Sequence, residues 1–189
     1  AHECGHMIRT YKEKNNRLMP YSTDETMNTA MQDIEKNNKV NFPPDVKSQI
    51  YPLWVNGIIT QLTSIPEDIR IEKWIYGNYP GLRKTQNEGL AKQIKDISDG
   101  MSPRIKEMTP KFVYEGSSII NYCYLRILND IIKNNVLNAM KSENYFQKAV
   151  KIFSDVTEIM KKDDSLTNSI EVSNYLAKNL GFDKWFMWK

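Results

Sequence analysis

Cysteine is scarce in this sequence. Two of its 189 residues are cysteines, Cys4 and Cys123, and neither belongs to a CxxC pair. Two cysteines are too few for a disulfide scaffold. Long apolar runs are missing as well, because the stretch 50–65 is interrupted by proline, asparagine, glycine and glutamine. A membrane-spanning helix needs about 20 predominantly apolar residues. The sequence therefore predicts neither a disulfide-rich fold nor a membrane span.

An excess of one charge is also lacking. Lysine and arginine number 26 against 23 aspartates and glutamates, and the net charge of +3 is spread along the chain rather than gathered into a basic arm. Proteins that bind nucleic acid concentrate positive charge, so nucleic acid is not an implied partner. With 40% hydrophobic residues, the chain is long enough for one good core, and one domain is the default expectation.

Strand patterns and internal repeats are absent too. No segment alternates apolar and polar residues, and β-branched residues do not cluster between glycine or asparagine turns. Helical periodicity, capping residues and proline or glycine stops predict an all-α multi-helix bundle instead. Pro52 is expected to kink or divide one helix, Ser64 to begin the next, and the aromatic tail 185–188 to pack back on the bundle. The expected helices are 2–15, 22–36, 45–62, 64–76, 82–98, 112–133, 143–161 and 166–180.

What the chain does contain is an HExxH motif, His2-Glu3-Cys4-Gly5-His6. Positions i and i+4 of a helix lie one above the other, so both imidazoles can reach one metal ion. Zinc bound by imidazoles lowers the pKa of its water, and Glu3 is placed to accept the proton as a general base. His2 and His6 are the only histidines in the chain. The motif predicts a zinc site, and the alternative is a chance HExxH on an exposed amphipathic helix.

The two inner residues of the motif support narrower expectations. Cys4 lies about 200° around the helix from His2, so we expect it to face away from the metal as a small buried residue. Gly5 weakens an isolated helix by about 1 kcal/mol relative to alanine. A close approach by another helix would explain this glycine, although a relaxed surface would explain it as well.

A catalytic zinc usually has three protein ligands, and no third histidine is available. The third ligand is therefore a carboxylate or a residue upstream of this chain. Glu67 is the preferred candidate, because in helical projection it lies in an apolar face with Ile71 and Trp74, where an unpaired carboxylate would seek a cation. Asp68 borders that face and is the reserve candidate. A competing interpretation places Glu67 in a capping box with Ser64.

This pattern resembles the zincin metallopeptidases and, within them, the gluzincin type, in which a glutamate on a later helix completes the HExxH site. His2, Glu3, His6 and Glu67 carry the resemblance. In several gluzincin families an acidic residue four positions after the ligand glutamate supports a zinc-bound histidine, but here that position holds Ile71. The resemblance implies zinc-dependent hydrolysis of peptide bonds, with Zn²⁺ as cofactor and a peptide or protein as substrate.

The resemblance also implies a tyrosine, histidine or arginine that stabilises the oxyanion. Since no further histidine exists, Tyr114, Tyr122 and Arg126 are the candidates. Two other functions stay open at this point. One is a helical interaction module whose metal site is decayed or structural, and the other is a zinc hydrolase that acts on a non-peptide bond.

The position of the motif bears on domain organisation. Gluzincins place a small substrate-binding sheet before the HExxH helix, whereas this sequence enters the motif directly after Ala1. We therefore expect residues 1–189 to be a single helical domain within a larger metallopeptidase. The metal-site helices are expected in residues 1–100, and a C-terminal helical region in residues 101–189.

Overall fold

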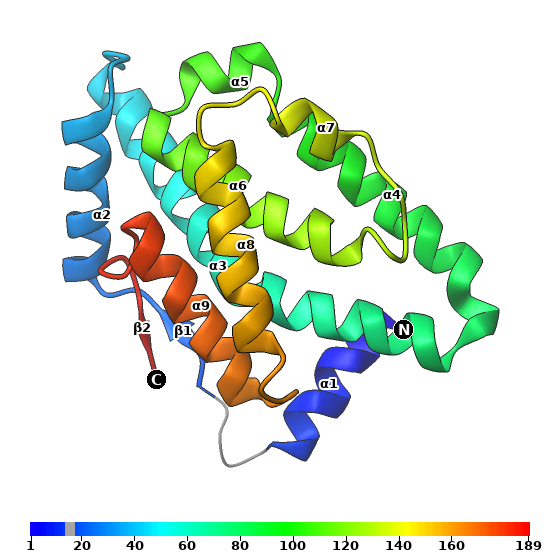
Figure 1. Cartoon of the computed structure of the whole chain (residues 1–189). Coiled ribbons are helices and arrows are strands. Elements are labelled where there is room, and N and C mark those ends of the chain that lie inside the picture. Colours follow the sequence, from blue (N-terminus) through cyan, green and yellow to red (C-terminus); the bar gives the residue numbers. More distant parts are fainter. Residues whose placement is uncertain (14–17) are drawn as a thin grey trace.

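The computed structural model describes residues 1–13 and 18–189, and this part of the chain folds as a bundle of helices (Figure 1). The expected all-α fold is confirmed. Residue 15, near which the first helix was expected to end, lies outside the described residues. The helices are α1 His2–Lys12, α2 Asp24–Asn37, α3 Pro44–Asn78, α4 Arg83–Gly100, α5 Pro103–Met108, α6 Lys111–Leu128, α7 Val136–Met140, α8 Phe146–Met160 and α9 Leu166–Leu180, with a 3₁₀ turn η1 at Pro80–Leu82.

Helix α3 is the axis of the bundle, and it corrects the expectation of two shorter helices. It runs unbroken for 35 residues with Pro52 and Pro66 inside it. Ser64 begins no helix, because its hydroxyl donates to the Thr60 carbonyl one turn earlier. A proline in a helix interior costs about 3 kcal/mol. The helix nevertheless continues because α1, α2, α6 and α9 all pack against it, and this burial outweighs the lost hydrogen bonds.

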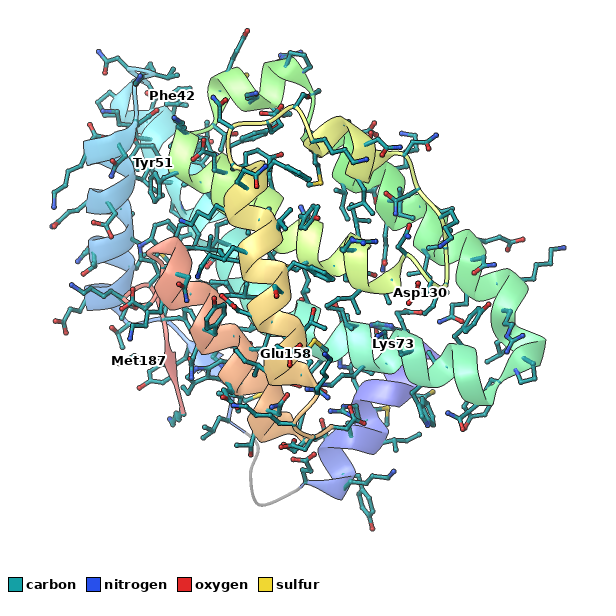
Figure 2. The ribbon with its side chains drawn as sticks, viewed as in Figure 1. Phe42, Tyr51, Lys73, Asp130, Glu158 and Met187 are labelled. Atoms are coloured by element: carbon teal, nitrogen blue, oxygen red, sulfur yellow. The ribbon has the colours of Figure 1, made fainter. Side chains whose placement is uncertain are left out.

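The core lies where α3, α6, α8 and α9 meet, and side chains fill the space between these helices (Figure 2). Helix α6 is largely buried in this core, and it ends at Leu128 rather than at the expected residue 133. Gly116 of α6 lies against the ring of Phe182, which leaves no room for a Cβ atom at this position. On the other side of α3, Tyr51 donates to Glu35 of α2.

The aromatic tail packs back on the bundle, as the sequence predicted. Trp185 and Phe186 are buried, and the indole N–H of Trp185 donates to Asp33 of α2. Next to them, two short strands pair in antiparallel register, β1 Pro20–Tyr21 with β2 Met187–Trp188. The sequence predicted no strand, because two residues are too few for an alternating pattern to show.

The remaining differences are short helices. Helices α5 and α7 lie in segments expected to be loops, and with six and five residues they are too short to carry a periodic apolar signal. Helix α9 spans the predicted residues, with Gly181 in the left-handed conformation at its end. Among the described residues, no helix is both long enough and apolar enough to cross a membrane.

Candidate metal centre

Helix α1 lies directly against the second half of α3, and Gly5 allows this contact. A Cβ atom built at Gly5 would lie 2.6 Å from Cγ2 of Ile71, which is closer than side-chain carbons approach. The backbone of α1 therefore rests on Ile71, and the close approach of another helix explains the glycine. Because Ile71 lies between Asp68 and Glu72 along α3, this contact sets the HExxH residues beside two carboxylates.

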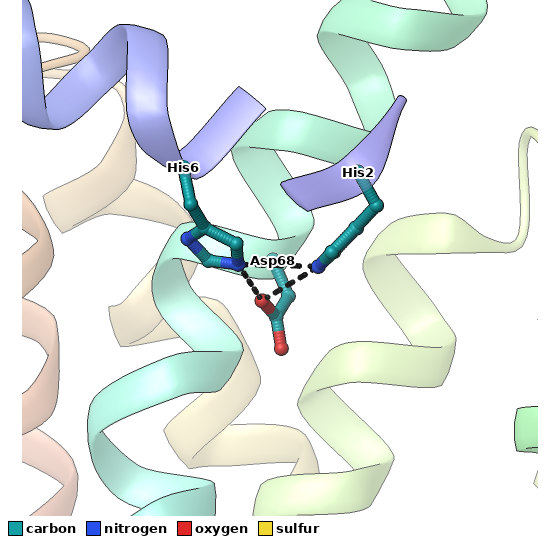
Figure 3. A group of neighbouring side chains, drawn as sticks. All are labelled: His2, His6 and Asp68. Carbon is teal, nitrogen blue, oxygen red and sulfur yellow. Dashed lines mark hydrogen bonds and ion pairs between the residues drawn. The ribbon is translucent and has the colours of Figure 1, made fainter. Parts of the chain in front are cut away.

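Three donor atoms converge between the two helices (Figure 3). Nε2 of His2 lies 3.2 Å from Oδ1 of Asp68, and Nε2 of His6 lies 3.1 Å from the same oxygen. The two Nε2 atoms are themselves 3.2 Å apart. His2, His6 and Asp68 thus form a nearly equilateral triangle of two imidazole nitrogens and one carboxylate oxygen, and all three residues are partly buried.

Glu72 contacts the other ring nitrogen of His2, Nδ1. Its Oε1 lies 2.7 Å from Nδ1 of His2, and only 6% of Glu72 is exposed. The side-chain amide of Gln86 donates to the other Glu72 oxygen and to the Glu72 carbonyl, which fixes the carboxylate in place. A carboxylate at Nδ1 keeps the proton on that nitrogen, so the Nε2 lone pair of a neutral His2 faces Asp68.

The Nε2 lone pair of a neutral His2 and the carboxylate oxygen of Asp68 repel each other, so a proton or a metal ion is needed between them. Hydrogen bonds from His2 to Asp68 and Glu72 raise the pKa of this imidazole to about 10, despite the opposing effect of burial. In the absence of a metal, a second proton on His2 satisfies the pair. A divalent cation can take the place of this proton, because an unprotonated imidazole and a carboxylate are both metal ligands.

The triangle fits the dimensions of a tetrahedral zinc site. Zinc binds imidazole nitrogen and carboxylate oxygen at about 2.0–2.2 Å, and ligand atoms of a tetrahedron with such bonds are separated by about 3.3 Å. The three edges of 3.1–3.2 Å are close to this spacing. The donor set of two imidazoles and one carboxylate, with Glu72 orienting one imidazole, is also the kind that catalytic zinc sites use.

The positions of the two side chains favour Asp68, rather than the expected Glu67, as the third ligand. Nε of Arg9 donates to Oε2 of Glu67 at 2.6 Å, a second Arg9 nitrogen donates to Oε1 at 3.2 Å, and the Ser169 hydroxyl also donates to Oε1. Glu67 does find a cation, but that cation is an arginine. The capping box with Ser64 is not formed either, because Ser64 lies inside α3.

The reason lies in the angular order of the two residues around α3. Successive helical residues are separated by about 100°, so Glu67 and Asp68 face different neighbours. Glu67 faces Ser169 of α9 and the second half of α1, whereas Asp68 faces His2 and His6. The sequence does not reveal where α9 packs, and this packing decides which carboxylate is left for the imidazoles.

Asp68 departs from the gluzincin pattern in being an aspartate, but it is followed at the expected spacing by an acidic residue. Counted from Asp68, the residue four positions later is Glu72, the carboxylate that supports His2. An acidic residue at this spacing is the signal that could have identified both residues from the sequence. Counted from Glu67, the residue four positions later is Ile71, so the acidic residue at this spacing was not recognised.

Of the two remaining polar residues of the motif, Cys4 lies on the outer side of α1, and Glu3 lies about 60° around the helix from His6. Glu3 and Cys4 are exposed, so the expectation of a buried Cys4 was wrong. Met7 and Tyr11, which follow Cys4 along the same face, are each 70% exposed. Helix α1 rests on α3 through the opposite face, where Gly5 is buried. Cys4 therefore faces away from the three donor atoms, as expected.

The three candidates for oxyanion stabilisation pack elsewhere. Tyr122 and Arg126 both contact the ring of Phe153 on α8, and Tyr114 packs against Tyr145 just before α8. These contacts place all three in the packing of α6 on α8 and its preceding loop. The expectation that one of them serves the metal centre gains no support from their positions.

Tyr124 is the tyrosine whose ionisation responds to the carboxylates of the centre. Burial raises its pKa first, and the negative charges of Glu72 and Asp68 raise it further. Its hydroxyl donates to Oε1 of Gln93 at 2.5 Å. Tyr124 lies about 200° around α6 from Tyr122, so it faces the opposite side of that helix. Nothing in the local sequence distinguishes these two tyrosines.

A hollow opens beside His6. It has a volume of about 300 Å³, and α1, the 18–20 segment, α3, α9 and β2 contribute to its wall. Leu18, Met19 and Trp188 provide apolar surface, and Leu18 and Met19 are about half exposed. The Arg9-bound carboxylate of Glu67 also lines it. The hollow therefore adjoins the candidate metal centre through His6, whereas His2 and Asp68 do not line it.

Comparison of the chain with models of known protein families, with curated proteins and with solved structures finds no match. The likeness to gluzincins is thus carried by His2, Glu3, His6, Asp68 and Glu72 alone, and membership of that group stays a prediction.

Proposed function

We propose that this protein is a zinc-dependent hydrolase of peptide bonds, with His2, His6 and Asp68 as the zinc ligands. The observation that supports the proposal most strongly is the triangle of their donor atoms, with edges of 3.1–3.2 Å, backed by Glu72 at Nδ1 of His2. A carboxylate brought between two imidazoles at the HExxH spacing is the arrangement that a catalytic zinc site needs.

Each residue has a separate chemical role in this proposal. A bound zinc ion supplies Lewis acidity and lowers the pKa of water. His2 and His6 offer Nε2 lone pairs, and Asp68 offers a negative charge that balances part of the ion's charge. Glu72 accepts the Nδ1 proton of His2 and keeps its lone pair directed at the site. Glu3, in the general-base position of the motif, accepts a proton from water and returns it to the leaving amine.

The hollow beside His6 supports a peptide as the substrate. Its apolar wall of Leu18, Met19 and Trp188 suits an apolar side chain, while Thr63, Ser64 and Ser169 contribute polar atoms at other points of the wall. Because His6 is part of this wall, a side chain held there lies next to the candidate metal centre. Small-molecule and peptide sites combine apolar walls with a few polar groups in this manner.

The alternative of an interaction module with a decayed metal site is less well supported. It would be favoured by imidazoles that lie far from any carboxylate, whereas Asp68 and Glu72 both contact His2. Hydrolysis of a non-peptide bond uses the same metal centre, so only the substrate test separates it from the leading proposal.

The substitution Glu3→Gln tests the proposed activity. We expect the zinc-loaded chain to cleave a peptide library at neutral pH, and E3Q to bind zinc as well as the unchanged chain while hydrolysis falls by about 10²- to 10⁴-fold. Cleavage is read by mass spectrometry, and bound zinc by elemental analysis. Glu25→Gln, on the exposed face of α2, is the matched control and retains full activity. Zinc-loaded protein that cleaves no peptide, or an E3Q variant as active as E25Q, contradicts the proposal.

A further inference from the structure

A second hollow lies in the other half of the bundle, between α3, the end of α4, α5 and α6. Its volume is about 400 Å³, and it shares no lining residue with the candidate metal centre or the hollow beside His6. We call it the α3–α6 hollow and define it by Trp54, Ile58 and Gln61 of α3, Ile97 of α4, and Tyr114 and Ser117 of α6.

The helices leave this space because α4 packs loosely. Leu90 is the one residue of α4 that is fully buried. Glycines mark both sides of the opening, Gly57 on α3 and Gly100 at the end of α4. A Cβ atom at either glycine would meet nothing within 4 Å. The space next to these backbones is therefore open and not filled by neighbouring side chains.

Two polar atoms in the wall of the hollow are buried without a partner. Among the described residues, Oε1 of Gln61 and the hydroxyl of Tyr114 have no hydrogen-bond partner. Ser118 and Tyr145 both approach the Tyr114 hydroxyl, so the unpaired oxygen of Gln61 is the stronger of the two observations. Buried polar groups in folded proteins are almost always satisfied, and an exception calls for a water, an ion or a ligand.

The chemistry of the wall restricts what can bind. Apolar side chains such as Trp54, Ile58 and Ile97 form much of it, and Asp96 is the one charged residue among the lining residues. A wall without a cation does not favour an anionic molecule. The unpaired Gln61 oxygen accepts a hydrogen bond, and the Tyr114 hydroxyl either donates or accepts one.

We propose that the α3–α6 hollow binds an uncharged small organic molecule that has an apolar ring-sized body and an N–H or O–H group. In this arrangement the Gln61 side chain turns Oε1, which neighbouring atoms cover in this structure, toward the donor of the ligand, while the ring lies against Trp54 and Ile58. The volume of the hollow is within the range of small-molecule sites in proteins. This site is independent of the proposed hydrolase activity, because the two share no residues.

The test uses two pairs of probes that differ in one hydrogen-bond donor: indole with 1-methylindole, and 4-methylphenol with 4-methylanisole. Each is titrated into the ¹⁵N-labelled full chain, and amide chemical shifts are followed by NMR. We expect saturable shifts at the lining residues of α3 and α6. The donor-bearing probe of at least one pair is expected to bind about fivefold to tenfold more tightly than its methylated partner, because that partner leaves Gln61 unsatisfied.

Two substitutions separate this site from unspecific binding. Gly57→Leu adds a side chain to the wall of the hollow at a point where a Cβ atom meets nothing within 4 Å, and we expect it to weaken binding more than tenfold. Gly89→Leu is the matched control, because Gly89 is also exposed, has open space around it and does not line the hollow. Gln61→Leu is expected to abolish the difference between the probes of a pair. Saturable binding that G57L and G89L retain equally overturns the proposal. The absence of saturable shifts with all four probes also overturns it, and the hollow would then contain only water.

Discussion

At the scale of single residues, the surroundings of His2 decide what the site can hold. One imidazole faces two carboxylates, Asp68 at Nε2 and Glu72 at Nδ1. The spacing of His2 and His6 in the sequence was sufficient to predict that their imidazoles would lie together. The identity of the carboxylate was not, because Glu67 and Asp68 are adjacent and only the packing of α9 assigns Glu67 to Arg9 and Ser169.

The pKa of His2 leads to a pH dependence of the metal-free protein. Its pKa is raised from 6.5 to about 10 by Asp68 and Glu72, so folding favours the protonated imidazole. This contribution to stability is fully present below about pH 6.5 and is lost as the pH rises through about 10. We expect the free energy of unfolding to fall over this interval more steeply in the unchanged protein than in His2→Gln. Urea unfolding at a series of pH values, with metal removed by a chelator, measures the difference. Parallel pH profiles of the two proteins contradict the assignment.

At the scale of secondary-structure elements, capping and stop signals predicted the positions of most helices. Tertiary burial explains where the observed helices differ from the predicted ones. Thr23 caps α2 and Gly181 ends α9 close to where the sequence placed these boundaries. The division expected in α3 did not occur, because proline and serine signals describe an isolated helix. A helix against which four others pack continues through Pro52 and Pro66 although each proline removes a backbone hydrogen bond. Such enclosure is a tertiary property and leaves no local signal.

The contact between α1 and α3 predicts the effect of a single methyl group at Gly5. In Gly5→Ala the new Cβ atom lies 2.6 Å from Ile71 unless one helix moves, so α1 shifts away from α3. The strain of overpacking, about 1–3 kcal/mol, exceeds the gain of about 1 kcal/mol in helix propensity. We expect reduced stability and at least tenfold weaker zinc binding, measured by thermal unfolding and calorimetric titration. Gly77→Ala on α3, which meets nothing within 4 Å, is the control. An unchanged zinc affinity in G5A would contradict the close approach.

At the scale of the whole molecule, a charge network ties the metal-site helix to the C-terminal region. Arg9 of α1 and Arg70 of α3 both contact Asp164, in the loop that precedes α9. Arg70 is buried and also donates to the Asp163 carbonyl and to the Asn168 side chain. The metal-site helices were expected in residues 1–100 and a C-terminal helical region in residues 101–189. This network and the packing of α9 on α3 join the two regions.

The network predicts an unequal response to the loss of two basic residues. Arg70→Ala leaves Asn168 and the Asp163 carbonyl without their partner in a buried environment, and we expect the free energy of unfolding to fall by about 2–4 kcal/mol. Lys95→Ala removes an exposed pair with Asp99 and is expected to change it by less than about 0.5 kcal/mol. Urea unfolding of the two variants gives the comparison. Equal effects would show that the network contributes little to the fold.

The most direct test of the metal centre compares the two neighbouring carboxylates of α3. Zinc is titrated by calorimetry into the unchanged chain, Asp68→Asn and Glu67→Gln, each first shown to be folded by circular dichroism. We expect the unchanged chain to bind one zinc ion, and D68N to lose at least about 100-fold in zinc affinity. The zinc affinity of E67Q is expected to change little, because Glu67 binds Arg9. A zinc affinity that falls in E67Q and survives in D68N, or an unchanged chain that binds no zinc at neutral pH, would contradict the metal centre described here.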